Sequence, residues 1–228
     1  MEVSVIIVTY NSAATIAECL KSVQEQQGVE REIHVIDNAS SDETSTVVRG
    51  FAAKLVLVEN RDNVGFGRAC NQGFAASKGR YIYFLNPDAQ LIGSYPLANL
   101  CHALSEHKNW GMAGSRVVSA TGEWKEPATS YPDQAHIRKD FSGLPGRIAW
   151  VVGASMIVRR EVYAELGGFD PEFFLYSEET DFCLRLRKCG YEIGMVENSA
   201  VRHIGGASES GRDPYEVWTR RSQGLLLF

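Results

Sequence analysis

The sequence predicts an α/β domain built around a mostly parallel sheet, with helices on both faces. Two observations lead to this prediction. Short β-branched runs alternate with segments of helical period through the first half of the chain. The runs are apolar at nearly every position, which is typical of strands buried on both faces of a parallel sheet. Ligands of such sheets bind at the carboxyl ends of the strands, so the residues that follow each strand are candidates for a site.

Four strands are expected in the first half, at Val3–Val8, Glu32–Asp37, Lys54–Glu59 and Arg80–Leu85. The helices between them are expected at about 12–27, 42–52 and 66–77, the first capped by Asn11 or Ser12 and the second opened by residues 40–43. The second half shows a helix near 94–107, apolar stretches at 111–118 and 150–158, a helix at 178–188, a strand near 191–196 and a helix from about 214. Residues 1–115 then form one half of the domain and residues 116–228 the other.

The segment 121–148 is rich in proline and glycine and is long for a structureless connection. It is therefore the candidate for a mobile or functional loop, such as a lid. The chain ends in the apolar run 224–228 without a capping residue behind it. We therefore expect the natural chain to continue beyond Phe228.

Composition and charge exclude several classes of protein. With 228 residues, of which 44% are hydrophobic, the chain can bury a substantial core, so intrinsic disorder is excluded. The formal net charge is -5 and no Lys/Arg cluster carries interleaved aromatics, so nucleic acid is not an expected partner. The longest strongly apolar stretch is 150–158, whereas a bilayer span needs about 20 residues, so no transmembrane segment is expected. No secretory signal precedes Val3, which favours a cytoplasmic location. The five cysteines are scattered and form no C-x-x-C motif, so we expect them to be reduced residues that pack in the protein.

Polar residues follow the first two expected strands. Thr9, Tyr10 and Asn11 come directly after the first strand, where a nucleotide base can dock. The alternative is a strand that ends in a helix cap, with Tyr10 as a packing aromatic. Asp37 ends the second strand, and its carboxylate can accept hydrogen bonds from a base or a ribose, or can cap the next helix instead.

Two further segments carry groups suited to a diphosphate and a cation. Residues 65–67 (Gly-Phe-Gly) open a helix whose amino end, with Arg68, can face a pyrophosphate, or they form a glycine-permitted turn with a surface arginine. Cys70 stands where the dinucleotide fingerprint needs glycine, which disfavours a Rossmann dehydrogenase. Asn86 and Asp88 follow the fourth strand, and their side chains suit a divalent cation that takes further oxygen ligands from a diphosphate. The alternative is an ordinary turn that contains an aspartate.

Acidic residues crowd the start of the helix expected at 178–188. Glu178, Glu179 and Asp181 place three negative charges within four positions, which raises at least one carboxyl pKa and suits a general base. The alternative is an acidic capping turn in which Arg185 is the helical partner of Asp181. His203 follows a short apolar strand and is either a structural histidine or a ligand.

Taken together, five segments in this order resemble family 2 glycosyltransferases of the GT-A fold, especially the bacterial rhamnosyltransferase-like branch. They are S-V-I-I-V-T-Y-N, V-I-D-N-A-S-S-D, N-V-G-F-G-R-A-C-N-Q-G, F-L-N-P-D and G-G-F-D-P-x-F-F-x-Y-x-E-E-x-D-x-C-x-R, and the likeness runs from Val3 to about Ser208. The resemblance implies an inverting, metal-dependent enzyme of cell-surface polysaccharide synthesis. Such an enzyme moves a sugar from a nucleoside-diphosphate sugar to a hydroxyl of a glycan or lipid-linked acceptor.

The resemblance also implies a role for each candidate. Asp37 would bind the base, and Arg68 would flank the sugar diphosphate. Asp88 and His203 would hold Mg²⁺ or Mn²⁺, although Asn86 stands where many relatives carry aspartate. The expected substrate-binding residues are Thr9, Tyr10, Asn11, Asp37, Gly65, Arg68, Asn86 and Trp150. The expected catalytic residues are Glu179, in the place of the family's aspartate base, Glu178 as its alternative, and Asp181.

The branch favours dTDP-rhamnose as donor, with a UDP-hexose second, and the 121–148 loop with the second half of the chain would select the acceptor. Peripheral association with the inner face of the plasma membrane is compatible with these partners. One alternative is a nucleotidyltransferase, although its glycine- and lysine-rich phosphate loop is not found near residues 9–20. The other alternative is a catalytically silent protein that binds a nucleotide sugar. Asn86 and Glu179 are compatible with it, because each stands where the resemblance implies an aspartate.

Overall fold

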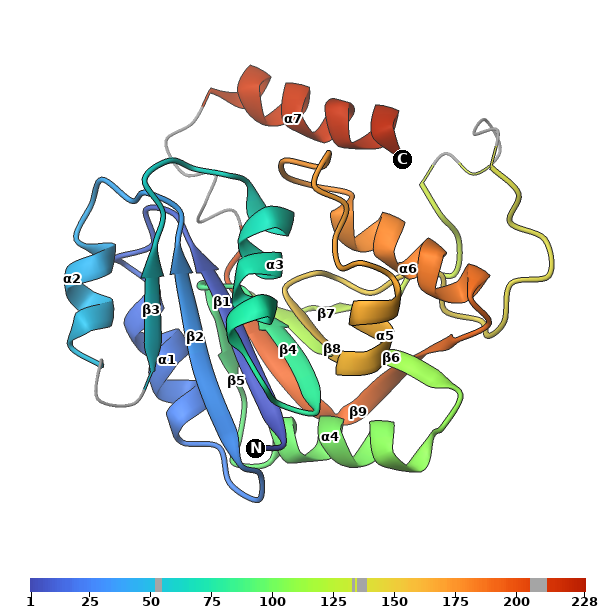
Figure 1. Cartoon of the computed structure of the whole chain (residues 1–228), viewed down its shortest axis with the longest axis horizontal. Helices are drawn as coiled ribbons and strands as arrows, with labels where there is room; N and C mark the ends of the chain where they lie inside the picture. The colour runs from blue at the N-terminus through green and yellow to red at the C-terminus, as the bar shows by residue number, and fades with distance from the viewer. Residues whose placement is uncertain (52–54, 133, 135–138, 206–212) are drawn as a thin grey trace.

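A computed structural model describes residues 1–51, 55–132, 134, 139–205 and 213–228 of the chain (Figure 1). In this part, strands of both halves join in one nine-stranded sheet. Its order is β3 (Val56–Glu59), β2 (Arg31–Asp37), β1 (Val3–Thr9), β4 (Tyr81–Leu85), β8 (Ser155–Arg159), β6 (Trp110–Ser119), β9 (Glu192–His203) and β5 (Ala89–Leu91), with β7 (Trp124–Lys125) paired to β6. Helices cover both faces of the sheet, so the predicted α/β fold class is confirmed.

The two faces of the sheet bury two separate hydrophobic cores. Side chains alternate between faces along a strand, so β1 feeds both layers. Val5 and Ile7 enter a core shared with helices α1 (Ile16–Gln24), α2 (Thr44–Arg49) and α4 (Pro96–Glu106). Ile6 and Val8 enter the other, with α3 (Phe66–Ala76), α5 (Arg160–Glu165) and α6 (Glu178–Lys188). This double burial explains why β1 reads as a continuous apolar run rather than an alternating one.

Parallel pairing, expected for most of the sheet, is limited to two parts of it. The strands β3, β2, β1 and β4 are parallel neighbours, and so are β6 and β9. However, β8 runs antiparallel to both β4 and β6, and β5 runs antiparallel to β9. Three elements were not expected from the sequence: β5 and β7 are too short to show a period, and α5 follows β8 without a turn signal.

Several element boundaries differ from the prediction. α1 begins at Ile16 after Thr15 without a side-chain cap, so neither Asn11 nor Ser12 caps it as predicted. Asn11 instead adopts a positive φ of 50°, and its Oδ1 accepts a hydrogen bond from the backbone N–H of Ser41 at 2.8 Å. Within the apolar stretch 150–158, the strand begins only at 155, and β9 extends beyond the expected 191–196 to residue 203. The predicted start of β3 at residue 54 and the predicted end of α2 at residue 52 lie outside the described residues.

The segment 121–148 is not structureless throughout. It contains β7, and Ala128 forms an isolated antiparallel bridge with Trp150. Residues 133 and 135–138 of the lid candidate lie outside the described residues. The last helix, α7 (Pro214–Leu227), lies across the top of Figure 1, above α3 and the loop that precedes α6. Among the helices of the described residues, none has the length and apolar character that a bilayer crossing requires.

Candidate functional site

The carboxyl ends of β1 and β2 lie side by side and share a buried hydrogen-bond network. Thr9 pairs with Asp37 in the parallel register, and its hydroxyl donates to Asp37 Oδ1 at 2.7 Å. The hydroxyl of Ser40 donates to the same oxygen at 2.6 Å, and the backbone N–H of Ser40 donates to Oδ2 at 3.0 Å. Asp37 is 2% exposed. It does not cap α2, which begins at Thr44, so the capping alternative is wrong.

Asn38 connects this strand end to the turn that opens α3. Its backbone N–H donates to the carbonyl of Thr9 at 2.8 Å, and its side-chain Nδ2 donates to the carbonyl of Gly65 at 3.1 Å. The side chain of Asn60 in turn donates to Asn38 Oδ1 at 2.8 Å. These bonds hold the ends of β1 and β2 against the glycine turn, so three segments of the expected donor site form one rigid edge.

The amino end of α3 contacts the loop that precedes α6. Gly65 has a φ of +91°, and a Cβ there would lie 2.6 Å from the carbonyl oxygen of Phe174, so the close approach requires glycine. The backbone N–H of Phe66 donates to that carbonyl at 2.9 Å. Arg68 is exposed, and its Nε donates to the carbonyl of Pro171 at 2.9 Å. The diphosphate role of Gly65 and Arg68 stays a prediction.

Asp88, Asn86 and His203 meet at the end of β4. Because β5 pairs antiparallel with β9, Ala89 lies opposite His203, which brings the imidazole to the aspartate. Nε2 of His203 lies 3.1 Å from Asp88 Oδ1 and 3.4 Å from Nδ2 of Asn86. The backbone N–H of Gly205 donates to Asp88 Oδ2 at 3.1 Å. Burial opposes ionisation of Asp88, but the hydrogen bond and charge of His203 and the N–H donors outweigh it and lower its pKa.

The chemistry of this group fits a hard divalent cation that takes further oxygens from a diphosphate. Asp88 and His203 offer an oxygen and a nitrogen ligand, and Asp88 is in the ionised form that a cation needs. Nδ1 of His203 is buried and has no hydrogen-bond partner in the described part of the chain. No group of three or more His, Cys, Asp or Glu side chains suited to a metal occurs among the described residues. Among the described residues, Asp88 and His203 would thus be the ligands of these types for a cation here, and a diphosphate could add further oxygens.

Two carboxylates open α6, of which Glu178 is buried and Glu179 is half-buried. Tyr176 and Ser177, directly before the helix, both have positive φ, at 73° and 71°, which is uncommon for residues other than glycine. Glu178 is 5% exposed, and burial together with the charge of Glu179 raises its pKa well above the usual range. Burial also raises the pKa of Glu179, although backbone N–H groups, including that of Gly153, partly offset the effect. Within the described residues, Oε2 of each carboxylate is buried and accepts no hydrogen bond.

The segment Gly153–Ala154 joins this carboxylate pair to the end of β4. Gly153 donates its N–H to Glu179, and a Cβ at Gly153 would lie 3.4 Å from Glu179 Oε1. The carbonyl of the next residue, Ala154, accepts the N–H of Asn86 at 3.0 Å. Glu179 is also less buried than Glu178. The fold thus brings a half-buried carboxylate of raised pKa next to the Asn86–Asp88 turn.

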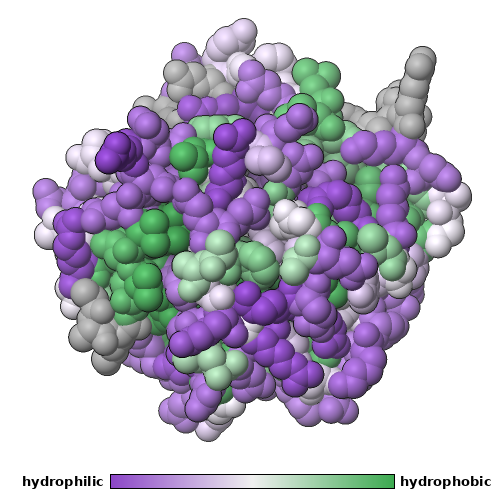
Figure 2. Space-filling view, viewed as in Figure 1, coloured by the Kyte–Doolittle hydropathy of each residue, from purple (hydrophilic) through white to green (hydrophobic). Residues whose placement is uncertain are grey.

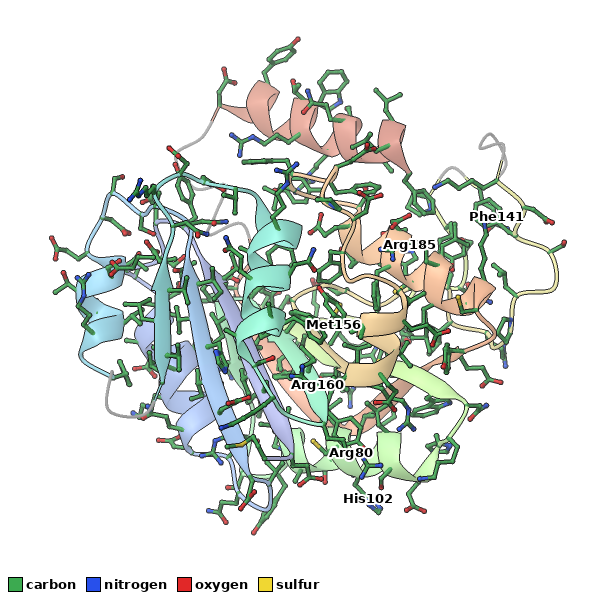
Figure 3. The ribbon with its side chains drawn as sticks, viewed as in Figure 1. Arg80, His102, Phe141, Met156, Arg160 and Arg185 are labelled. Carbon is green, nitrogen blue, oxygen red and sulfur yellow. The ribbon has the colours of Figure 1, made fainter. Side chains whose placement is uncertain are left out.

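Asp181 and Arg185 form the helical ion pair that their spacing predicts. Nε of Arg185 lies 2.6 Å from Asp181 Oδ2, and the guanidinium also donates to the carbonyls of Leu166 and Gly168 at 2.8 and 2.9 Å. Figure 3 shows Arg185 on the middle of α6, beside the ribbon of the preceding loop. The pair therefore fixes the loop before α6, and Asp181 is engaged in holding structure.

A family model described as Glycosyl transferase family 2 matches residues 4–167, more than half of the chain. This chain belongs to that family. The resemblance drawn from the five sequence segments is confirmed. Membership of this family favours a glycosyltransferase over the nucleotidyltransferase alternative.

Two curated relatives of this family 2 glycosyltransferase are rhamnosyltransferases. The chain is 25% identical over 257 residues to the N-acetylglucosaminyl-diphospho-decaprenol L-rhamnosyltransferase of Mycobacterium tuberculosis, a match that covers 98% of this chain and 82% of the relative. It is 24% identical over 219 residues to the O-antigen chain rhamnosyltransferase RfbN of Salmonella typhimurium, which covers 89% of this chain and 66% of the relative. The chain thus spans about two-thirds of the length of the Salmonella protein.

Solved structures share the fold at lower identity. S. aureus TarS 1-349 superposes with a TM-score of 0.73 at 19% identity, covering 99% of this chain and 71% of that one. The mannosyltransferase PcManGT from Pyrobaculum calidifontis, in complex with GDP-Man and Mn²⁺, gives a TM-score of 0.72 at 23% identity, covering 98% of this chain and 61% of that one. These likenesses show that the glycosyltransferase has the GT-A fold.

Trp150, the remaining candidate of the substrate side, anchors the 121–148 segment in this structure. Its indole N–H donates to the carbonyl of Ser130 at 3.2 Å, and its backbone carbonyl accepts the N–H of Ala128 at 3.2 Å. Arg187 of α6 holds the far end of the same segment by donating to the carbonyls of Pro145 and Gly146 at 2.9 and 3.0 Å. A substrate contact of Trp150 stays a prediction.

Sequence reasoning missed the residues that hold the site together. Asn38, Ser40, Gly153 and Arg187 were not among the candidates, although the first two lie in the quoted V-I-D-N-A-S-S-D segment. Their position in that segment was the only available signal. Gly153 and Arg187 act through partners distant in the chain, which no local pattern reveals.

Proposed function

We propose that this chain is an inverting glycosyltransferase that moves a sugar, with rhamnose favoured, from a nucleoside diphosphate to a hydroxyl of a glycan or lipid-linked glycan. The observation that carries the proposal is the carboxylate pair Glu178–Glu179, whose pKa values are raised by burial at the start of α6. A carboxylate with a raised pKa is suited to take a proton near neutral pH. The link from Glu179 through Gly153 and Ala154 to Asn86 supports a role for it beside the donor.

The proposed reaction is a single displacement. Glu179 takes the proton of the acceptor hydroxyl as its oxygen forms a bond to the anomeric carbon from the face opposite the leaving group. The bond from that carbon to the diphosphate oxygen breaks, and its electron pair leaves with the nucleoside diphosphate. Attack from the opposite face inverts the configuration, and no covalent intermediate with the protein is needed.

The donor would lie across the carboxyl ends of β1, β2 and β4. Asp37, fixed by Thr9 and Ser40, would orient the base at the end of β2. Arg68 would stabilise charge that develops on the diphosphate as it leaves. A divalent cation, Mg²⁺ or Mn²⁺, would be held by Asp88 and His203 and would stabilise negative charge on the leaving diphosphate.

The named relatives support the choice of donor and acceptor. Two relatives are named as rhamnosyltransferases, which supports rhamnose as the transferred sugar, and one is named for a diphospho-decaprenol acceptor. We propose dTDP-rhamnose as the donor, with a UDP-hexose as the second choice. We accordingly place the protein in cell-surface polysaccharide synthesis, on the cytoplasmic side and at the inner face of the membrane. The second candidate, a silent nucleotide-sugar-binding protein, is favoured by Asn86 and Glu179, which depart from the family's aspartates.

The proposal is tested by thermal shift with a panel of nucleotide sugars, with and without Mn²⁺, followed by an assay for released nucleoside diphosphate. A donor should raise the melting temperature with the cation present. Release of nucleoside diphosphate that depends on an acceptor supports transfer. Binding without release, across all acceptors of the panel, would instead support the silent binding protein.

A further inference from the structure

Four hydroxyl groups lie deep inside the sheet, away from the surface. Figure 2 shows that most of the surface on this face of the molecule is hydrophilic, which is where polar side chains normally lie. The four hydroxyls belong instead to Tyr83, Ser155, Ser115 and Ser199, none of which is more than 2% exposed. Tyr83 is part of the hydrophobic core shared with α1, α2 and α4. A hydroxyl in such a core costs free energy unless it is hydrogen-bonded, so these groups need partners.

The four groups form one hydrogen-bonded series, the hydroxyl chain, across neighbouring strands. Oη of Tyr83 on β4 lies 2.7 Å from Oγ of Ser155 on β8. Oγ of Ser155 donates to Oγ of Ser115 on β6 at 2.8 Å. Oγ of Ser115 lies 3.1 Å from Oγ of Ser199 on β9. A serine hydroxyl carries one proton, and Ser155 gives its proton to Ser115, so Tyr83 is the donor in the first bond. The hydroxyl chain thus follows the sheet order β4, β8, β6 and β9.

Ser155 ends a turn that contacts the proposed catalytic base. Its backbone N–H donates to the carbonyl of Val152 at 3.4 Å, which closes the turn over Gly153 and Ala154. Burial raises the pKa of Glu179, and the N–H of Gly153 is one of the backbone donors that partly offset the rise. The position of this turn therefore sets one of the hydrogen bonds that the Glu179 carboxylate receives.

The hydroxyl chain holds the turn from two sides. The oxygen of Ser155 accepts from Tyr83 of β4 and donates to Ser115 of β6, and Ser155 is the first residue of β8. Hydrogen bonds weaken steeply when their distance or angle changes, and a fully satisfied buried network favours one arrangement of the core. The start of β8, and with it Gly153, is thereby fixed relative to the end of β4.

We propose that Ser155, held by the hydroxyl chain, is a positioning residue that keeps the N–H of Gly153 directed at Glu179. Ser155 acts through the turn and does not touch substrate. The inference rests on the proposed transferase function, in which Glu179 is the base, and it assigns core residues to the support of that site. Removal of the hydroxyl should let the turn move and weaken the bond from Gly153 to Glu179. Because that bond stabilises the ionised carboxylate, the pKa of Glu179 should then rise.

Other titratable groups near the base stay unchanged in this test. Glu178 and Cys183 of α6 both interact with the charge of Glu179. The turn itself, Val-Gly-Ala at 152–154, has no titratable side chain. A change in the pKa of Glu179 after substitution in the hydroxyl chain therefore reports on the turn.

Carbon NMR of protein labelled at the glutamate carboxyl carbons measures this pKa without any need for turnover. Loss of one signal in Glu179→Gln assigns the resonance. In Ser155→Ala and in Tyr83→Phe the pKa of Glu179 should lie at least about 0.5 pH unit above that of wild type. If Ser155→Ala does not fold, Tyr83→Phe decides, since it deletes one oxygen atom and keeps the ring in the core. The same pKa in wild type and in the chain variants would overturn the proposal.

Ser4→Ala is the matched control for the loss of a buried hydroxyl. Ser4 lies on β1, is as buried as the residues of the hydroxyl chain, and donates to Glu32 at 2.6 Å. It has no bond to the hydroxyl chain among the described residues. Ser4→Ala should therefore lower the melting temperature but leave the pKa of Glu179 at its wild-type value. An equal rise in the control and in the chain variants would refute a specific role of Ser155.

The pH dependence of transfer separates positioning from stability alone. A base must be unprotonated, so the acid limb of kcat should move to higher pH with the pKa of Glu179, and kcat on that limb should fall at least about threefold. KM for the donor should stay within about twofold of wild type, because Asp37 and Thr9 lie on strands outside the hydroxyl chain. A lower melting temperature with an unmoved acid limb would show a purely structural role and overturn the inference. Wild-type protein that releases no nucleoside diphosphate would refute the transferase proposal instead, and the NMR titration would still decide whether Ser155 positions the turn.

Discussion

The imidazole of His203 lies 3.1 Å, from Nε2 to Oδ1, from the carboxylate of Asp88, although the two residues belong to opposite halves of the chain. The contact follows from the antiparallel pairing of β5 with β9, which sets Ala89 opposite His203. A side chain from the last strand in the sequence is thereby brought to the turn at the end of the parallel strand β4. The same pairing lowers the pKa of Asp88 through the hydrogen bond and charge of His203, against the opposing effect of burial.

The first prediction concerns this pair as a cation site. Asp88→Ala and His203→Ala should each remove the extra stabilisation that Mn²⁺ gives to the nucleoside-diphosphate complex, about 2.7 kcal/mol at a hundredfold excess of ligand over Kd. Thermal shift with UDP or dTDP, with and without Mn²⁺, measures the loss. Asp62→Ala changes an exposed aspartate away from the pair and should keep the effect. A full Mn²⁺ effect in both pair variants would exclude the site.

The second prediction concerns the base. Glu179→Gln keeps the shape of the side chain but cannot take the acceptor proton, so transfer should fall by roughly 10²–10⁴ while nucleotide-sugar affinity stays near that of wild type. Steady-state rates together with calorimetry separate the two quantities. If Glu178→Gln alone lost turnover, the base would be the neighbouring residue. Wild-type rates in both variants and in the double variant would rule out a carboxylate base.

The third prediction concerns pH and Glu178. Burial and the charge of Glu179 raise the pKa of this carboxyl in the folded protein above its unfolded value of about 4.3. Its contribution to stability is therefore fully present below that value and is lost as pH rises towards the folded pKa. The free energy of unfolding of wild-type protein should fall over this window, and the slope should be smaller for Glu178→Gln. Urea titrations at several pH values measure both slopes, and equal slopes would contradict the assignment.

The fourth prediction concerns Asp37. Asp37→Ala removes the carboxylate that is proposed to orient the base, so hydrogen-bonding groups of the bound nucleotide lose their partner and nucleotide affinity should weaken by about 1–3 kcal/mol. Calorimetry with UDP and with dTDP provides the test. Ser45→Ala is the control, because its hydroxyl lies 3.4 Å from Asp37 Oδ2 and contributes little. Unchanged affinity for both nucleotides in Asp37→Ala would remove Asp37 from the donor site.

The fifth prediction concerns Asp181. Asp181→Asn weakens the hold of Arg185, which also binds the carbonyls of Leu166 and Gly168, so the free energy of unfolding should fall by about 1–2 kcal/mol. Glu59→Gln breaks an exposed ion pair with Arg49 and should cost under about 1 kcal/mol. Chemical denaturation compares the two variants. A smaller loss for Asp181→Asn than for Glu59→Gln would be inconsistent with a structural role.

The first half of the fold could be predicted because its signals are local. The strands β1 and β4 are nearly continuous apolar runs, β2 carries Ile33, Val35 and Ile36 between polar ends, and the helices between the strands show a clear period. The antiparallel placement of β8 could not be predicted, because strand order depends on which edges meet after the chain has folded. The short elements β5 and β7 carry too few residues for any period.

The sequence by itself determined the kinds of groups at the candidate site: a threonine and an aspartate after the first two strands, an aspartate after the fourth, and a carboxylate cluster at the start of a helix. Only the tertiary structure decided how they are coupled. It joined Asp88 to His203 through a strand pair, Glu179 to Gly153 through a backbone hydrogen bond, and α7 to Tyr176 through a glycine contact. The reason is physical: side-chain chemistry and local period are properties of neighbouring residues, whereas burial, pKa shifts and long-range hydrogen bonds arise from packing between distant segments.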